Sequence, residues 1–207
     1  MKTVLIANPK GGSGKTTLAT NLAGYFASLN YRVMLSDLDR QQSATGWLQR
    51  RSAELPFIES HQPKAKQTDF KAKWLVADSP GGFRDEKLSD AIKQADCIIV
   101  PVQPSAFDIG ATQDFLDLLN AEKAIRKQKT FVALVGMRVN TRTNAAIKLS
   151  EFMAQTNFPV LTYLRNAQSY VTAAEQGLSL FDMRPSLVAQ DIEQWRPLLD
   201  WIDQTTA

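Results

Sequence analysis

The sequence predicts a doubly wound α/β fold, in which a mostly parallel sheet carries helices on both faces. Short runs rich in Val, Ile and Leu alternate with longer stretches of helical periodicity throughout the 207 residues. Polar residues suited to chemistry come directly after several of these runs, where crossover connections bring the carboxyl ends of parallel strands to one edge. The length suits a single domain, 1–207, and the sequence contains no repeat or linker that would divide it.

The expected strands in the first part of the chain are short apolar runs that end in acidic or turn-forming residues. They lie at 3–7, 32–36 and 73–77, with a weaker edge strand near 56–59. Between them, an amphipathic stretch at 15–30 and a shorter one at 43–52 have the length and periodicity of helices. The segment 60–72 is polar and is expected to form a loop or a short helix.

The second part of the chain repeats this alternation. Its strands are expected at 97–102, 131–136 and 160–164, where apolar residues dominate. Its helices are expected at 85–95, 109–124, 142–156, 168–176 and 187–203. Strands that alternate with helices in this way predict parallel pairing through right-handed crossovers.

Composition excludes several classes of protein. Hydrophobic residues make up 44% and charged residues 22% of the chain, as in an ordinary globular protein. A single cysteine, Cys97, and a single histidine, His61, exclude an internal disulfide and a histidine metal cluster, and Cys97 stands in an apolar run that predicts a buried strand. No apolar run reaches the roughly 18 residues of a membrane span, and the first residues do not resemble a secretory leader. We therefore expect a cytoplasmic protein.

Basic residues are concentrated in one part of the chain. Residues 121–170 carry eight Lys or Arg and two acidic residues, a local net charge of +6, whereas the rest of the chain carries −3. Such a block is typical of a surface that binds phosphate backbones, although a solvated charged face is the more common reason for one. Composition alone therefore leaves nucleic-acid binding open.

A glycine-rich loop follows the first expected strand. Residues 8–17 read Asn-Pro-Lys-Gly-Gly-Ser-Gly-Lys-Thr-Thr and lead into a helix. The glycines let successive backbone amides point at phosphate oxygens, and the helix N-terminus adds a positive dipole. Lys15 supplies a cation beside the β- and γ-phosphates, and the Thr16 hydroxyl is suited to a magnesium ion. The loop predicts a site for a nucleoside triphosphate with Mg²⁺, formed by Gly11, Gly12, Ser13, Gly14, Lys15, Thr16 and Thr17.

Lys10, at the start of the loop, is not required in an ordinary phosphate loop. With this lysine, the stretch Lys10–Thr17 resembles the deviant Walker A motif of the ParA/MinD family of ATPases. In that family the early lysine reaches across a dimer interface to the nucleotide of the partner subunit. The resemblance implies that Lys10 binds ATP in trans and takes part in catalysis beside Lys15, so that ATP holds two copies of the chain together.

Three aspartates that follow strands are expected to complete the site. Asp37 and Asp39 are separated by one residue, and the turn after Ser36 must direct both side chains to the site if both serve it. The resemblance implies that Asp39 orients or deprotonates the attacking water beside the nucleotide, and that Asp37 lies near the magnesium ion. Asp78 resembles the Walker B aspartate of the family, which contacts the magnesium of the bound nucleotide through water. The metal ligands implied are Thr16, Asp37, Asp39 and Asp78.

Two positions depart from the family pattern. Arg40 stands where the family usually has proline, and it either adds charge near the phosphates or faces solvent. Met137 stands where relatives often place an asparagine against adenine, so packing and backbone contacts at Met137 and Arg138 are expected to hold the base. The resemblance covers nearly the whole chain, from the glycine loop through the proline turn at 100–105 to the segment 163–167.

The resemblance implies an ATP-dependent partitioning or positioning ATPase for a plasmid, a chromosome region or a protein cargo. Family members of this type dimerise on ATP and coat double-stranded DNA without sequence preference. A ParB-like or other adaptor protein then stimulates hydrolysis and release. The expected cofactors are ATP and Mg²⁺, the expected location is the nucleoid, and the residues expected to contact DNA phosphates are Arg138, Arg142 and Arg165.

Other functions are compatible with the same loop. A MinD-like membrane ATPase needs a terminal amphipathic helix rich in Lys and Arg, but residues 196–204 contain Pro197 and end acidic. Their apolar residues are expected to pack a last helix onto the domain, so we expect no membrane partner. A metabolic ligase or kinase needs a dedicated substrate pocket, and no motif identifies one. A purely structural DNA-binding module would not need three nucleotide motifs.

Overall fold

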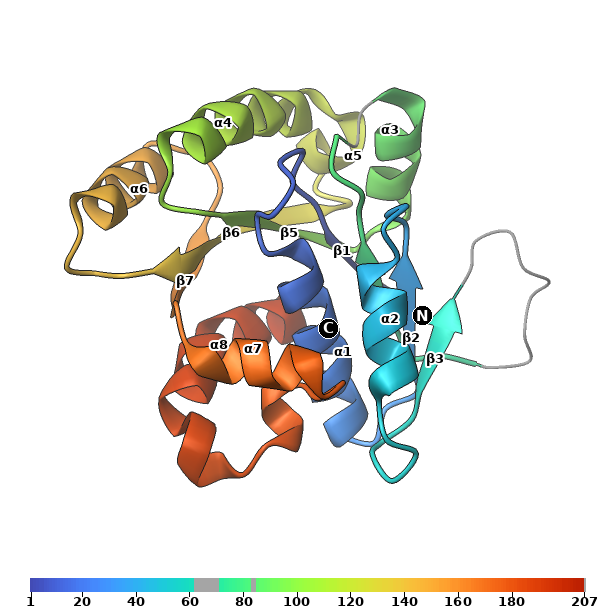
Figure 1. Ribbon diagram of the computed structural model, residues 1–207. Helices are drawn as coiled ribbons and strands as arrows, with labels where there is room; N and C mark the ends of the chain where they lie inside the picture. Colours follow the sequence, from blue (N-terminus) through green and yellow to red (C-terminus); the bar gives the residue numbers. More distant parts are fainter. Residues whose placement is uncertain (62–70, 83–84, 207) are drawn as a thin grey trace.

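The computed structural model describes residues 1–61, 71–82 and 85–206. Within them, one parallel sheet has the strand order β3-β2-β4-β1-β5-β6-β7 (Figure 1). The strands are β1 (Lys2–Ile6), β2 (Val33–Asp37), β3 (Ile58–His61), β4 (Trp74–Asp78), β5 (Cys97–Val102), β6 (Phe131–Val139) and β7 (Val160–Arg165). Since every neighbouring pair is parallel, the carboxyl ends of all these strands lie at one edge of the sheet.

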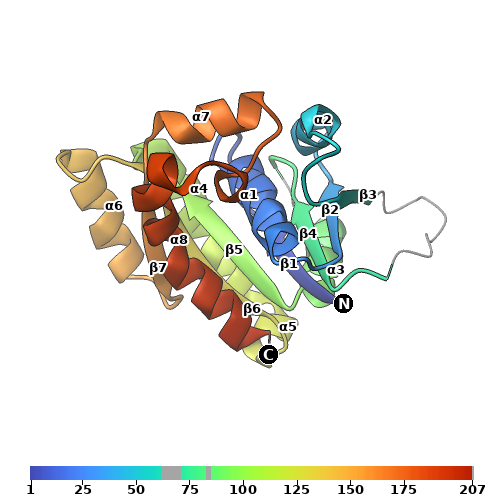
Figure 2. The same ribbon diagram turned by 90° about the horizontal axis from the view of Figure 1, so that it is seen from below.

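Helices cover both faces of the sheet, as Figures 1 and 2 show from two sides. One face carries α1 (Lys15–Ser28), α2 (Ser43–Arg50), α7 (Gln168–Glu175), the short 3-10 helix η1 (Leu180–Asp182) and α8 (Pro185–Thr205). The other face carries α3 (Asp85–Gln94), α4 (Ala106–Ala121), α5 (Lys123–Arg126) and α6 (Asn144–Ala154). The predicted doubly wound fold is therefore confirmed.

The strand β1 lies near the middle of the sheet and contributes side chains to the hydrophobic core on each face. Side chains alternate along a strand, so Val4 and Ile6 pack beneath α1 and α8, whereas Leu5 and Ala7 pack beneath α3 and α4. In register, Ile6 lies opposite Asp78 of β4, and Asp78 lies opposite Asp37 of β2. The glycine loop and the predicted aspartates therefore start at the same level of the sheet.

The elements differ from the sequence prediction mainly at their ends. The strand β6 runs three residues further than predicted, and α4 begins at Ala106 because Ser105 caps it by accepting a hydrogen bond from the Asp108 amide. The last helix, predicted at 187–203, spans Pro185–Thr205 and contains Pro197. In the polar segment 60–72, Ser60 and His61 belong to β3, and residues 62–70 lie outside the described residues.

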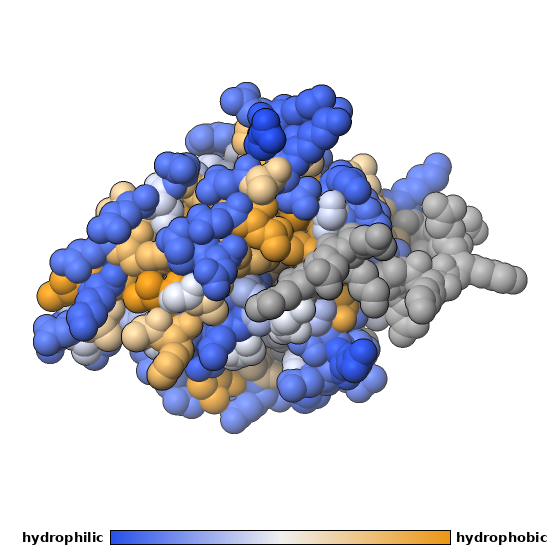
Figure 3. Space-filling view, turned by 90° about the horizontal axis from the view of Figure 1, so that it is seen from above, coloured by the Kyte–Doolittle hydropathy of each residue, from blue (hydrophilic) through white to orange (hydrophobic). Residues whose placement is uncertain are grey.

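Hydrophobic side chains reach the surface over α4 and α6, on the left of the space-filling view in Figure 3. Phe107 and Ile147 are 84% and 54% exposed there. In contrast, the apolar residues of α8, including Trp195 and Leu198, are buried in the core beneath the sheet, as the sequence predicted for the last helix. None of the described helices combines the length and the hydrophobicity needed to cross a membrane.

A buried ion pair fastens the end of α2 to η1. Arg51 and Asp182 lie 2.8 Å apart, with only 5% and 2% of their side chains exposed. We expect Arg51→Met to lower the free energy of unfolding by about 3 kcal/mol, because it leaves the Asp182 carboxylate buried without its cation. Urea unfolding measures this loss. The neighbouring Arg50→Met is the control, since Arg50 is exposed and donates only to the Ala174 carbonyl, and its cost should stay below about 1 kcal/mol.

The same pair gives a pH dependence. Burial alone would raise the pKa of Asp182, but hydrogen bonds from Arg51 and Ser179 lower the pKa below its usual value. The stability contributed by Asp182 is therefore complete above the pKa of an unfolded aspartate and is lost as the pH falls below it. Arg51→Met should weaken this acid dependence, and an equal loss of stability at neutral and acidic pH would contradict the assignment.

Candidate functional site

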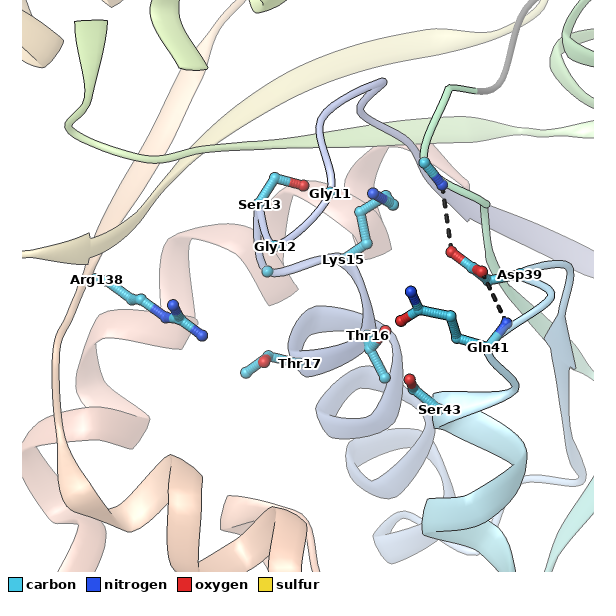
Figure 4. Close-up of a pocket in the computed structure, with 12 residues that line it drawn as sticks. Gly11, Gly12, Ser13, Lys15, Thr16, Thr17, Asp39, Gln41, Ser43 and Arg138 are labelled. Atoms are coloured by element: carbon cyan, nitrogen blue, oxygen red, sulfur yellow. Dashed lines mark hydrogen bonds between the residues drawn. The ribbon is translucent and has the colours of Figure 1, made fainter. Parts of the chain in front are cut away.

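The glycine loop between β1 and α1 forms one wall of a cavity of about 540 Å³ (Figure 4). Gly12 and Gly14 have φ angles of 76° and 102°, which residues with a side chain rarely adopt. A Cβ on Gly14 would also lie 2.8 Å from the Met137 side chain. The curled loop therefore depends on glycine at these positions.

The wall formed by the loop is suited to an anion. No side chain caps the N-terminus of α1, so its first backbone amides remain available to a ligand. Ser13 lines the cavity, and its hydroxyl is buried without a hydrogen-bond partner among the described residues. Because a buried hydroxyl without a hydrogen-bond partner is destabilising, a phosphate oxygen in the cavity would supply the acceptor that the Ser13 hydroxyl lacks.

The two lysines of the loop lie in different surroundings. Lys15 is buried, lines the cavity and donates a hydrogen bond from Nζ to the Lys10 carbonyl oxygen at 2.9 Å. Burial lowers the pKa of Lys15, whereas the charges of Asp78 and Asp39 act in the opposite direction. The Lys10 side chain is exposed, does not line the cavity, and has no hydrogen bond or ion pair with the described residues. Lys15 thus lies in the cavity of its own chain, whereas the Lys10 side chain lies exposed outside it.

Thr16 and Asp78 join the start of α1 to the end of β4. The Thr16 hydroxyl donates a hydrogen bond to Asp78 Oδ2 at 2.7 Å, and the buried Oδ1 atom has no partner among the described residues. Burial raises the pKa of Asp78 to about 7, although the Thr16 hydrogen bond acts to lower it. A divalent cation nearby would favour the ionised carboxylate.

The structure separates the roles of Asp37 and Asp39. The Asp37 carboxylate accepts hydrogen bonds from the backbone amides of Asp39 and Thr45, at 3.1 and 2.8 Å, and does not line the cavity. It therefore shapes the turn and the first residues of α2, while its charge also acts on Asp78, which lies opposite Asp37 in the sheet. Asp39 lines the cavity.

Asp39 connects two loops across the cavity. Its Oδ1 accepts a hydrogen bond from the Gln41 amide at 3.0 Å, and its Oδ2 accepts one from the Gly81 amide at 3.2 Å (Figure 4). The next glycine, Gly82, donates to the Pro9 carbonyl oxygen at 2.7 Å. The loop after β4 is therefore tied both to Asp39 and to the start of the glycine loop.

The sequence prediction missed several residues of this cavity. Gln41 and Ser43 line it from the α2 side, whereas Arg138, which the sequence did indicate, lines it from the β6 side, as Figure 4 shows. Gln41 lies in the loop after β2 and Ser43 begins α2, so the rule that ligands bind at strand ends would have found them. Gln103, after β5, donates a hydrogen bond to the Gly12 carbonyl oxygen, a contact that local sequence does not indicate. Arg40 is exposed, in agreement with the solvent-facing alternative.

A second cavity of about 260 Å³ adjoins the first and shares Thr17 and Arg138 with it. Its walls come from the end of β7, from α7 and from Met137, which is buried against the glycine loop. The lining is Thr17, Met137, Arg138, Leu164, Arg165, Asn166, Ala167, Tyr170, Val171, Ala174 and Glu175. This mixture of apolar side chains with a few polar groups suits a flat organic ring.

The three arginines predicted to contact DNA are not equivalent. Arg138 and Arg142 are exposed and form no ion pair with described residues. Arg165 instead contacts the buried Asp191 carboxylate through Nε and Nη2, at 2.5 and 3.2 Å. Arg165 is therefore committed to a contact within the protein.

The donors present fit Mg²⁺ bound together with phosphate. In the ranges 1–61, 71–82 and 85–206, no three His, Cys, Asp or Glu side chains form a metal-binding group. Magnesium commonly uses one or two protein oxygens and completes its shell with water and substrate phosphates. The Thr16 hydroxyl and the unpaired Oδ1 of Asp78 supply such oxygens beside the loop.

Comparison with known proteins agrees with this site. The model of the CobQ/CobB/MinD/ParA nucleotide-binding domain matches residues 4–180. The Maintenance of carboxysome distribution protein A of Gloeobacter kilaueensis is 25% identical over 98% of this chain and 94% of its own length. Protein ParA of Rhizobium radiobacter is 30% identical over 73% of this chain and 69% of its own length.

Solved structures share the fold over nearly the full length. A complex of Cyanothece McdA with ATP superposes with a TM-score of 0.71, at 17% identity, over 99% of this chain and 96% of that one. A plasmid partition protein from Borrelia burgdorferi bound to AMPPNP gives 0.70, at 19% identity, over 96% and 98%. Given the family match over residues 4–180 and the site formed around the glycine loop, the chain belongs to the CobQ/CobB/MinD/ParA family of nucleotide-binding proteins.

Proposed function

We propose that this chain is an ATP-dependent positioning ATPase, acting as one ParA-like domain over residues 1–207. It dimerises on ATP, binds double-stranded DNA without sequence preference, and leaves the DNA when an adaptor protein stimulates hydrolysis. One observation carries the proposal: Lys10 stands exposed and unpaired beside the glycine loop, while Lys15 occupies the cavity of the same chain.

In this proposal the nucleotide spans the two adjoining cavities. The triphosphate lies against Gly11, Gly12, Ser13 and Gly14, with Lys15 and the amides of α1 neutralising its charge. Thr17 and Arg138, which both cavities share, lie where the two halves of the nucleotide meet. The base lies in the second cavity against Met137 and α7. Packing and a few polar groups hold the base there, because Met137 offers no hydrogen bond.

Hydrolysis in this site is mainly a matter of position and charge. Asp39 accepts a hydrogen bond from the attacking water and aligns it with the γ-phosphate. Thr16 and Asp78 would hold Mg²⁺, which would neutralise charge on the phosphate oxygens. Lys10 of a second copy supplies a further positive charge, so a monomer is slow.

The surface near Lys10 supports a contact between two copies. Gln103 ties the loop after β5 to Gly12, and α4 begins three residues later. The first turn of α4 exposes Phe107, an 84% exposed aromatic side chain that a partner would cover. The proposed dimer therefore buries Phe107 and places Lys10 beside the partner's nucleotide.

In this proposal DNA contacts two exposed arginines. Arg138 lies near the end of β6, and Arg142 lies in the loop that follows β6. Arg142→Ala should weaken DNA binding to all sequences alike and reduce the slope of log K against log[salt] by about one, because one phosphate contact is lost. Fluorescence anisotropy with duplex DNA across salt concentrations measures the slope. Lys93→Ala is the control, since Lys93 lies on α3 and pairs with Asp90. If Arg142→Ala leaves the slope unchanged, Arg142 does not contact DNA and the DNA-binding surface lies elsewhere.

The proposed function as a whole is tested by a mobility-shift assay with ATP, ADP or no nucleotide, together with phosphate release. We expect retardation of DNA only with ATP, and slow hydrolysis that an adaptor protein stimulates. Equal retardation in the three conditions would overturn the DNA-switch proposal. Turnover stimulated by a small molecule, and not by DNA with a protein partner, would favour a metabolic ligase or kinase.

A further inference from the structure

Helix α8 anchors the wall of the second cavity although, among the described residues, it contributes none of the lining. Figures 1 and 2 both show α8 beside α7 at the β7 end of the sheet. Polar contacts from little more than one helical turn of α8 join it to that wall. They involve Asp191, Gln194 and Trp195 of α8.

Asp191 is the central anchor. It is 0% exposed, and its carboxylate accepts hydrogen bonds from Arg165 Nε and Nη2 and from the Ser169 hydroxyl at 2.8 Å. Arg165 ends β7 and Ser169 lies in the first turn of α7. The Asp191 carboxylate thus links the end of β7 to the start of α7. The two residues between these elements, Asn166 and Ala167, line the cavity.

Two neutral contacts support the same junction. Gln194 Oε1 accepts a hydrogen bond from the Arg165 amide at 3.0 Å, and the Gln194 carbonyl accepts one from the Thr162 hydroxyl. Trp195 Nε1 donates to the Tyr170 hydroxyl at 3.0 Å, and Tyr170 lines the cavity. The backbone and one ring of the wall therefore take their position from α8.

We propose that Asp191 is a positioning residue for nucleotide binding, which acts through Arg165 and Ser169 to hold the wall that receives the base. This inference rests on the proposed function, because it assumes that a nucleotide base occupies the second cavity. It also explains why Arg165, despite standing in the basic block of the sequence, is paired within the protein. The phosphate end of the site does not depend on this contact, since the glycine loop and Lys15 belong to other elements.

The test compares a ligand that has a base with one that lacks it. In Asp191→Asn the shape is kept and the charge is lost, so the Kd of Mg-ATP should rise about tenfold while that of Mg-tripolyphosphate stays within about twofold. KM for ATP should rise while kcat at saturating ATP stays nearly unchanged, because the lost contact stabilises the bound nucleotide equally in the ground state and the transition state. Isothermal titration calorimetry and steady-state phosphate release measure these quantities.

Glu193→Gln is the matched control, because Glu193 lies on the same helix, is exposed and pairs only with Arg196. Gln194→Met is a milder second variant, which removes the acceptor of the Arg165 amide without disturbing a buried charge. It should raise the Kd of ATP in the same selective way, and it keeps the inference testable if Asp191→Asn does not fold.

The outcomes separate the inference from the proposed function. If the parent chain binds ATP but both ligands weaken equally in the variants, or neither weakens, Asp191 is a general structural residue and the inference is wrong. If the parent chain binds neither ATP nor tripolyphosphate, the proposed function fails first and the inference fails with it.

Discussion

Asp39→Asn should lower kcat for ATP hydrolysis by about 100-fold or more while the Kd of Mg-ATP changes little. Asparagine keeps the size of the side chain and one oxygen, so it can still accept a hydrogen bond from the Gly81 or Gln41 amide. What it loses is the negative charge and the basic oxygen that would align and deprotonate water. Phosphate release at saturating ATP, together with calorimetric binding, measures both quantities.

Asp37→Asn is the matched control for this prediction. The two aspartates are separated by one residue, but the Asp37 carboxylate is bonded to the amides of Asp39 and Thr45 outside the cavity. Replacing it should lower the free energy of unfolding by about 1 kcal/mol through a weakened helix start. Its kcat should stay within about threefold of the parent value. A loss as large as that of Asp39→Asn would show that Asp37 acts in the reaction.

Lys10→Ala should abolish ATP-dependent dimerisation and fast hydrolysis, while a monomer still binds ATP through Lys15. The reason is geometric, since the Lys15 ammonium points into the cavity of its own chain and the Lys10 ammonium does not. Sedimentation with ATP and with ADP measures the dimer, and nucleotide affinity is measured at a protein concentration where the parent is monomeric.

A mixture of two inactive variants tests whether Lys10 acts in the site of the partner subunit or in the site of its own chain. In a dimer of Lys10→Ala with Asp39→Ala, the first subunit keeps its own Asp39 and receives Lys10 from the second. One of the two sites in a mixed dimer is then complete, so an equal mixture should recover turnover that neither variant has alone, up to the roughly one quarter of the parental value that random pairing would give. If Lys10 acts within its own chain, no site in any dimer is complete, and the mixture stays as inactive as its components.

Local patterns in the chain were enough to predict the strands, most of the helices and the glycine loop. These features depend on neighbouring residues: the apolar run Val4–Ala7, the glycines at 11, 12 and 14, and the lysine and threonine that follow them. The rule that ligands collect at the carboxyl ends of parallel strands also placed Asp39 and Asp78 near the loop. Ends of elements were less accurate, as at Ala106 and Val139, because caps and sheet neighbours set them.

What the sequence by itself determined is therefore the fold class, the phosphate loop and the family to which the chain belongs. Only the tertiary structure decided which side chains are free to act: it assigned Asp37 to backbone amides, paired Arg165 with Asp191, and placed Gln103 on the glycine loop. The physical reason is that loop formation depends on contacts within a few residues. A charge is free or paired according to the groups that packing brings beside it, and Asp191 lies 26 residues from Arg165 in the chain.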